Sequence, residues 1–112
     1  MTVQLDDEQL TKDLSGDNQR KREDAMRLVY LDALPHLKKL VGRYRLGDDK
    51  ALDLASEGII KLMHNLKEDR FRGESSLKTY FLSICFGTLM NELRRGNRNV
   101  DIEDSSDIHP AF

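Results

Sequence analysis

The sequence contains one cysteine, no tryptophan and two prolines among its 112 residues. A single cysteine excludes an internal disulfide and is typical of a reducing compartment. Because there are only four phenylalanines and three tyrosines, aliphatic side chains must fill most of the core. No apolar run approaches the roughly 18 residues of a membrane-spanning helix, and the N-terminus has no signal-peptide pattern. We therefore expect a cytoplasmic protein without membrane insertion.

Metal-binding and catalytic patterns are also missing from the sequence. The three histidines, His36, His64 and His109, lack the short spacing of metal ligands. No nucleophile is paired with a candidate base, and there is no glycine-rich phosphate loop. We predict no metal site, no cofactor and no enzymatic activity.

Charged residues make up 34% of the chain and are distributed unevenly. The net charge is −2, yet residues 1–34 and 99–112 are acidic, whereas residues 35–98 carry an excess of lysine and arginine. A basic middle segment between acidic ends allows a local nucleic-acid surface on a mildly acidic protein.

The first half of the chain predicts a short helix followed by a longer one. Asp6 or Asp7 is a suitable N-cap for a helix that contains Leu10 and Leu14 and ends at Gly16.

Asp17 is the expected N-cap of the longer helix. Within that helix, Pro35 predicts a kink or a break, because proline lacks an amide hydrogen and clashes with the preceding turn. Residues 47–49 are expected to form the turn into the next helix.

A further amphipathic helix is predicted from about Asp49 to Leu66. Its apolar residues recur at steps of three and four, which places them on one buried stripe. That stripe consists of Leu52, Ala55, Ile59, Leu62, Met63 and Leu66. A polar face of the same helix consists of Asp53, Glu57, Lys61 and His64.

A polar loop at residues 67–76 precedes the last predicted helix, which Ser75 or Ser76 caps. Gly96 is the expected stop, and Arg94 with Arg95 falls in the final turn. Cys85 is expected to be a small core residue. The apolar stripe of this helix is Leu77, Tyr80 or Phe81, Ile84, Thr88 or Leu89, and Leu93.

No segment alternates as a β-strand does, and no internal repeat is present. The expected fold is therefore all-α, a compact bundle of about four or five helices. Residues 1–98 form the expected helical domain, and residues 99–112 form an acidic linker or tail.

Several ordered motifs resemble region 2 of bacterial sigma factors, and most closely the extracytoplasmic-function (ECF) group of the sigma-70 family. The segment ALDLASEG at 51–58 is similar to the family's A-x-D-L-x-Q-E, and FRGESSLKTY at 71–80 is similar to F-R-G-E-S-S-F-x-T-W/Y. MNELRR at 90–95 resembles L-x-D-x-L-R-R, and LSGD at 14–17 matches L-x-x-G-D.

The resemblance implies the sigma region 2 fold and a function in transcription initiation. In the family, the helix that corresponds to residues 49–66 docks on the clamp helices of the β′ subunit of core RNA polymerase. Outward carboxylates suit that arginine-rich partner. The implied polymerase-binding residues are Asp53, Ser56, Glu57, Ile60 and Lys61.

The family's loop captures a flipped base of the promoter −10 element on the non-template strand, and the basic end of the next helix contacts the DNA backbone. Polar groups and stacking offset the free energy of base flipping. The implied DNA-binding residues are Arg70, Phe71, Arg72, Gly73, Glu74, Ser75, Ser76, Lys78, Thr79, Tyr80, Arg94, Arg95 and Arg98.

These residues also have purely structural interpretations. Asp53 and Glu57 fit a solvated helix face, Tyr80 fits a core position, and Arg94 with Arg95 fits the helix dipole.

The sequence departs from the family pattern at several positions. Ser56 stands where glutamine is common, and Ser83 and Phe86 stand where arginine is frequent in ECF factors. Gly87 and Asn91 replace a common asparagine and aspartate. The missing positive charges weaken the expected duplex contact midway along the last helix.

A complete ECF factor continues into region 4, which recognises the −35 element. We expect this chain to be the N-terminal half of such a factor, with a natural short relative as the alternative. The alternative function is a polymerase-binding adaptor or competitor without promoter recognition. An anti-sigma factor is a further candidate partner.

Overall fold

The computed structural model describes the backbone of residues 7–100 and the side chains of residues 7–96. Four helices cover most of this range: α1 (Asp7–Ser15), α2 (Gln19–Arg43), α3 (Asp48–Lys67) and α4 (Leu77–Val100). Residues 7–100 contain no strand, and the predicted all-α class is confirmed. Within the same range, no helix combines the length and apolar character needed to cross a membrane.

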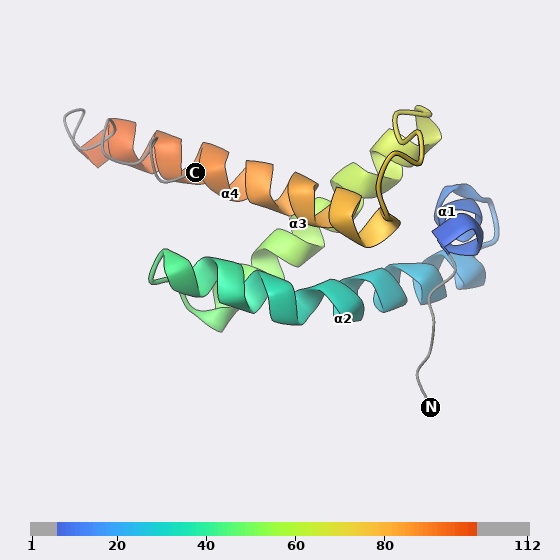
Figure 1. Cartoon of the computed structure of the whole chain (residues 1–112), viewed down its shortest axis with the longest axis horizontal. Coiled ribbons are helices and arrows are strands. Elements are labelled where there is room, and N and C mark those ends of the chain that lie inside the picture. The colour runs from blue at the N-terminus through green and yellow to red at the C-terminus, as the bar shows by residue number, and fades with distance from the viewer. Residues whose placement is uncertain (1–6, 101–112) are drawn as a thin grey trace.

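The three long helices pack against one another, and α1 lies across one end of the bundle. In Figure 1, α2 and α4 run in the same direction, and α3 returns obliquely between them. Helix α3 contacts both α2 and α4, and α1 packs on α2 and α3. This arrangement places α1 and the loop between α3 and α4 at the same end of the molecule (Figure 1).

All four helices contribute to one core, and most of its side chains are aliphatic. Its largest fully buried residues include Phe81, Leu14, Leu37, Leu54 and Leu62. Each such side chain stabilises the fold by roughly 1.5–3 kcal/mol relative to an exposed one. Phe81 is the one aromatic ring among the fully buried side chains described, in agreement with the aromatic-poor composition.

Helices α3 and α4 pack tightly at Gly58, where there is no room for a side chain. A Cβ atom on Gly58 would lie 2.6 Å from the Sγ of Cys85 and 3.2 Å from a ring carbon of Phe81. Cys85 is fully buried, as predicted, and its thiol donates to the Leu54 carbonyl at 3.5 Å.

The environment of Cys85 keeps its thiol protonated at neutral pH. Burial disfavours the thiolate and raises the pKa of Cys85 to about 12, although nearby Lys61 lowers it and Glu57 adds to the increase. A protonated, enclosed thiol is a poor nucleophile, so Cys85 serves packing.

One capping prediction needs correction, and another falls partly outside the described residues. Asp7 is the first residue of α1, and Asp6, the alternative cap before it, is not among the described residues. The Asp7 carboxylate accepts a hydrogen bond from the Leu77 amide, 2.9 Å away at the start of α4. The N-cap of α2 is Asn18 and not Asp17, because the Asn18 side chain accepts from the Lys21 amide at 3.1 Å.

Of the two alternatives predicted at Pro35, a kink or a break, the break is wrong, because α2 continues through Pro35 as one helix. Pro35 lies on the exposed side, whereas Ala33 and Leu37 on either side of it are fully buried. Packing of these neighbours holds the helix together despite the hydrogen bond that proline cannot make.

The buried stripe of α3 is rotated from the predicted one. Ala55, Ile59, Leu62 and Leu66 are buried as predicted, and Met63 is partly buried. Leu52, however, is 39% exposed. Leu54 occupies the core in its place, because the stripe centres on Ala51, Leu54, Ala55 and Gly58.

Helix α4 begins as predicted but extends beyond the expected end. The Ser76 hydroxyl accepts from the Thr79 amide at 3.1 Å, which is N-cap geometry. Gly96 does not stop the helix, which reaches Val100. A glycine inside a helix costs only about 1 kcal/mol, so it permits a stop without imposing one.

The apolar stripe of α4 agrees with the prediction in outline. Leu77, Phe81, Thr88 and Leu89 are buried, whereas Tyr80, Ile84 and Leu93 are partly buried. Residues 99 and 100 still belong to α4, and the rest of the predicted tail, residues 101–112, lies outside the described residues.

Candidate functional site

The five residues predicted to bind the polymerase share one solvent-exposed face of α3. Their spacing of three and four residues keeps them on adjacent turns. Ile60 is 68% exposed and adds an apolar side chain to this charged face. The exposed residues of this face are Asp53, Ser56, Glu57, Ile60 and Lys61.

The sequence did not predict that Leu52 would also be exposed, one turn before Ser56. The spacing of Leu52 from Ala55 and Ile59, in steps of three and four, predicts a core position that the structure does not bear out. Leu54 lies on the same side of α3 as the small residues Ala51, Ala55 and Gly58. This grouping of small residues around Leu54 is the sequence signal that could have identified Leu52 as exposed.

The side chain of Lys61 extends from this face toward α4. Its ammonium group lies 3.4 Å from the Glu57 carboxylate and donates to the Thr88 hydroxyl at 2.7 Å. The Thr88 hydroxyl in turn donates to the Ile84 carbonyl at 3.0 Å. Lys61 therefore connects the exposed face of α3 with the middle of α4.

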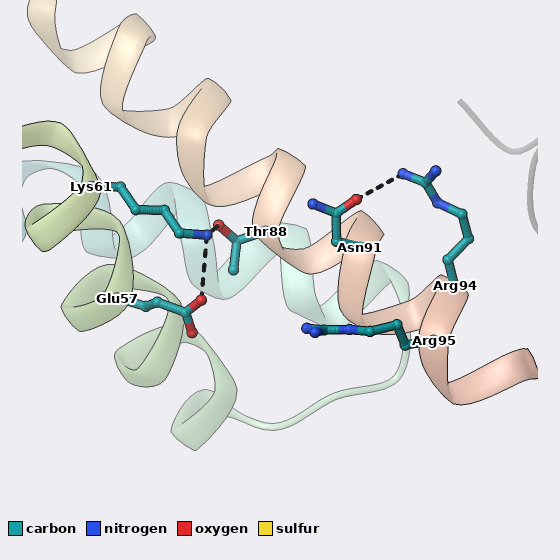
Figure 2. A pocket seen from close by; sticks show the side chains of 6 residues that line it. All are labelled: Glu57, Lys61, Thr88, Asn91, Arg94 and Arg95. Carbon is teal, nitrogen blue, oxygen red and sulfur yellow. Dashed lines mark hydrogen bonds and ion pairs between the residues drawn. The ribbon is translucent and has the colours of Figure 1, made fainter. Parts of the chain in front are cut away.

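A polar cavity of about 370 Å³ lies between α3 and α4 beside Lys61. Figure 2 shows that Arg95 extends toward α3, whereas Arg94 turns to Asn91, to which it donates at 2.9 Å. Three cationic side chains face one carboxylate here, so the cavity carries an excess of positive charge. Its lining residues are Glu57, Lys61, Thr88, Asn91, Arg94 and Arg95.

The structure separates the predicted basic residues of α4 into two groups. A rise of 1.5 Å per residue puts Lys78 about 24 Å from Arg94 along the helix. Lys78 also pairs with Asp32 of α2 at 3.5 Å. Lys78 and Arg94 are therefore not part of one basic patch. The side chain of Arg98 lies outside the described ones.

The first residues of the loop between α3 and α4 have a defined backbone conformation. Asp69 adopts a left-handed conformation with φ 58°, and the Arg70 amide donates to the Asn65 carbonyl at 2.9 Å. These features form a Schellman-type helix end. The Arg70 guanidinium pairs with Glu68 at 2.8 Å.

Phe71 and Tyr80 connect the loop to both neighbouring helices. Their ring centroids are 4.7 Å apart with a tilt of 34°, a favourable aromatic contact. The Tyr80 hydroxyl accepts a hydrogen bond from the side-chain amide of Asn65, on α3, at 3.1 Å. Tyr80 is half-buried, and this contact with Phe71 holds the loop in place.

The middle of the loop projects into solvent. Arg72, Glu74 and Ser75 are exposed, as is Thr79 in the first turn of α4. Gly73 has φ 75°, where a glycine is favoured, and a Cβ atom there would meet nothing within 4 Å. Gly73 is therefore required by the backbone conformation and not by crowding within the chain.

Comparison with known proteins identifies the family. The family model for Sigma-70 region 2 matches residues 29–99, which is well over half of the chain. No curated protein and no solved structure gives a significant match. Sigma-70 region 2 is a transcription-initiation domain that binds RNA polymerase and recognises the promoter −10 element. The matched segment includes the exposed face of α3, the loop and nearly all of α4, and the chain therefore belongs to the Sigma-70 region 2 family.

Proposed function

We propose that this chain is the N-terminal half of an ECF sigma factor that acts with core RNA polymerase in the cytoplasm. Helix α3 docks on the β′ clamp helices, and the loop at residues 68–76 holds one unpaired base of the non-template −10 strand. The main support is the anchoring of the loop through Phe71, Tyr80 and Asn65 to the helices on both sides.

Charge and exposure support the docking of α3. Asp53 and Glu57 are exposed carboxylates one turn apart, and they are complementary to the arginines of the clamp helices in this family. Ile60 offers apolar surface next to them. An apolar side chain surrounded by charged groups is typical of the centre of a protein interface.

Preorganisation supports base capture by the loop. Because both ends of the loop are fixed, little conformational entropy is lost when a base binds. The exposed Arg72, Glu74 and Ser75 supply hydrogen-bond donors and acceptors. These groups offset the free energy of unstacking the base.

The cavity between α3 and α4 supports a contact with the DNA backbone. Arg94, Arg95 and Lys61 supply positive charge, and Asn91 adds a polar side chain, the groups that bind a phosphate. We therefore propose that Lys61 serves the DNA side of the molecule, which revises the polymerase-binding role inferred from the family motif.

The second candidate function is an adaptor or competitor that binds polymerase but does not recognise the promoter. Ser83 is exposed and donates to the Tyr80 carbonyl at 2.6 Å, and Phe86 is partly buried. Neither residue carries a positive charge, so positions 83 and 86 lack the cationic side chains of the family pattern. Lys78 is ion-paired with Asp32, which leaves the DNA-facing side with less positive charge than the family pattern has.

One experiment separates the two candidates. The chain is assembled with core RNA polymerase and mixed with promoter forks whose unpaired −10 strand is randomised. Enrichment of particular bases among the bound forks is the expected result for a sigma factor. Retention of the chain on polymerase without base enrichment would favour the adaptor. Failure to bind polymerase would contradict both.

The salt dependence of fork binding should change when the two arginines at the cavity lose their charge. For Arg94→Gln with Arg95→Gln, we expect the slope of log affinity against log salt concentration to become shallower by about 1.5, because each phosphate contact contributes about 0.7–0.9. Fluorescence anisotropy at several salt concentrations measures this slope.

The matched control is Lys38→Gln with Lys39→Gln, which removes two exposed charges from α2. An equal change of slope in the control would show that only the net charge matters. In that case the cavity would not be a phosphate site.

A further inference from the structure

A second cavity lies between α1 and the loop at residues 68–76. Its volume is about 440 Å³, which is within the range of small-molecule sites in proteins. The wall on the loop side is made by Phe71, Gly73 and Ser75, all within the segment proposed to hold an unpaired base. The opposite wall belongs to α1, which precedes the segment matched by the family model.

Helix α1 is held in a fixed position beside this cavity. Leu10 and Leu14 are buried in the core. The Asp7 carboxylate accepts from the Leu77 amide at 2.9 Å, which joins the start of α1 to the start of α4. Because Leu77 follows the loop directly and is itself 1% exposed, this bond fixes the distance between α1 and the end of the loop.

The two walls differ in chemistry. The loop side offers the half-buried ring of Phe71 and the bare backbone of Gly73, which suit the flat face of a base. The α1 side is polar, and its lining residues are Asp7, Glu8, Thr11 and Lys12.

Three of the four polar residues on the α1 wall offer acceptors, and the fourth, Lys12, is a donor that pairs with the Glu8 carboxylate at 3.6 Å. The bond to Leu77 uses one oxygen of the Asp7 carboxylate, and the second can accept another hydrogen bond. The Thr11 hydroxyl donates to the Asp7 carbonyl at 2.7 Å, so only its lone pairs remain for a ligand. The acceptors of Asp7 and Thr11 suit a ligand edge that carries N–H donors.

We propose that α1 forms the second wall of the base site. An unpaired base enters between α1 and the loop, stacks toward Phe71, and presents an exocyclic amino group to Asp7 and Thr11. Adenine, cytosine and guanine carry such a group, whereas thymine does not. This inference rests on the proposed function, because it assumes that the loop binds single-stranded DNA.

Site-specific photocrosslinking tests the placement of the base. A photoreactive amino acid replaces Glu8, Ser75 or Asp13 in separate proteins, each assembled with core RNA polymerase on the randomised forks. Glu8 lines the cavity from α1 and Ser75 lines it from the loop. Asp13 is the matched control, because it lies on α1 away from the cavity.

The probes at positions 8 and 75 should crosslink to the same nucleotide of the unpaired strand, with a yield several-fold above that of the probe at position 13. A crosslink from position 75 without one from position 8 would overturn the role of α1 and leave the proposed function standing. No crosslink from either position would contradict the proposed function as well.

Asp7→Asn tests the chemistry of the base. The asparagine oxygen can still accept from the Leu77 amide, so the fold should persist, but its amide adds a donor that thymine can use. Discrimination against thymine at the crosslinked position should fall about tenfold. Unchanged discrimination would overturn the assignment of an amino-bearing base, and thermal unfolding checks that the variant remains folded.

Discussion

Asp53→Arg combined with Glu57→Arg should weaken binding of this chain to the β′ clamp helices by about a thousandfold or more. Each reversal removes an attraction and adds a repulsion toward an arginine-rich partner, a change of roughly 2–5 kcal/mol for a close charge pair, and every 1.4 kcal/mol is about tenfold in affinity. Fluorescence anisotropy with labelled clamp helices measures the effect.

The fold should tolerate this double substitution. Both carboxylates are exposed, and the ion pair between Glu57 and Lys61 is solvent-accessible, so its loss should change the free energy of unfolding by at most about 1 kcal/mol. Circular dichroism during urea unfolding checks this.

The matched control is Glu23→Arg with Asp24→Arg, which makes the same change of net charge on an exposed part of α2. Near-native affinity is expected for the control. If the variant at positions 53 and 57 also binds with native affinity, this face of α3 is not the docking surface.

Gly58→Val should lower the free energy of unfolding by about 3 kcal/mol or more, which corresponds to the upper range for overpacked cores. A Cβ atom at this position would already lie 2.6 Å from the Sγ of Cys85 and 3.2 Å from Phe81, and both side chains are fully buried. Thermal unfolding should show a midpoint lowered by roughly 15 °C.

A double-mutant cycle locates the clash. Gly58→Ala should destabilise the native protein but cost much less in a Cys85→Ala background, because that background lacks the Sγ atom. The coupling free energy should be about 1–3 kcal/mol.

Gly87→Ala in α4 is the control for a glycine that has free space around it. A Cβ atom there meets nothing within 4 Å, so the substitution should stabilise the helix by up to about 1 kcal/mol. Equal destabilisation by Gly58→Ala in both backgrounds would show that Cys85 does not limit the approach of α3 to α4.

The helices and their exposed faces could be predicted from the sequence because helical periodicity is a local property. The spacing of Ala55, Ile59, Leu62 and Leu66 predicted the buried side of α3, and Asp53 with Glu57 predicted the exposed side. The ordered motifs at 51–58, 71–80 and 90–95 indicated the family that the match over residues 29–99 then showed. The cap at Ser76 and the burial of Cys85 were also predictable.

Local patterns failed where neighbouring residues compete for the same role. Asp17 and Asn18 are both good N-caps, and the side chain of Asn18 makes the bond. Leu52 and Leu54 are equally apolar, and the packing of α3 on two helices decides which one is buried. Pro35 disfavours a helix locally, but burial of residues on both sides of it outweighs that preference.

The two cavities depend on contacts between residues far apart in the chain, which no local pattern encodes. Asp7 and Leu77 are 70 positions apart, and their hydrogen bond places α1 beside the loop. Lys61 and Thr88 are 27 positions apart, and their contact directs the lysine from the exposed face of α3 toward the cavity that Arg94 and Arg95 line. Charge and periodicity thus determined the helices and most of their exposed residues, whereas only the packing of the helices decided between Leu52 and Leu54 and which exposed residues share a site.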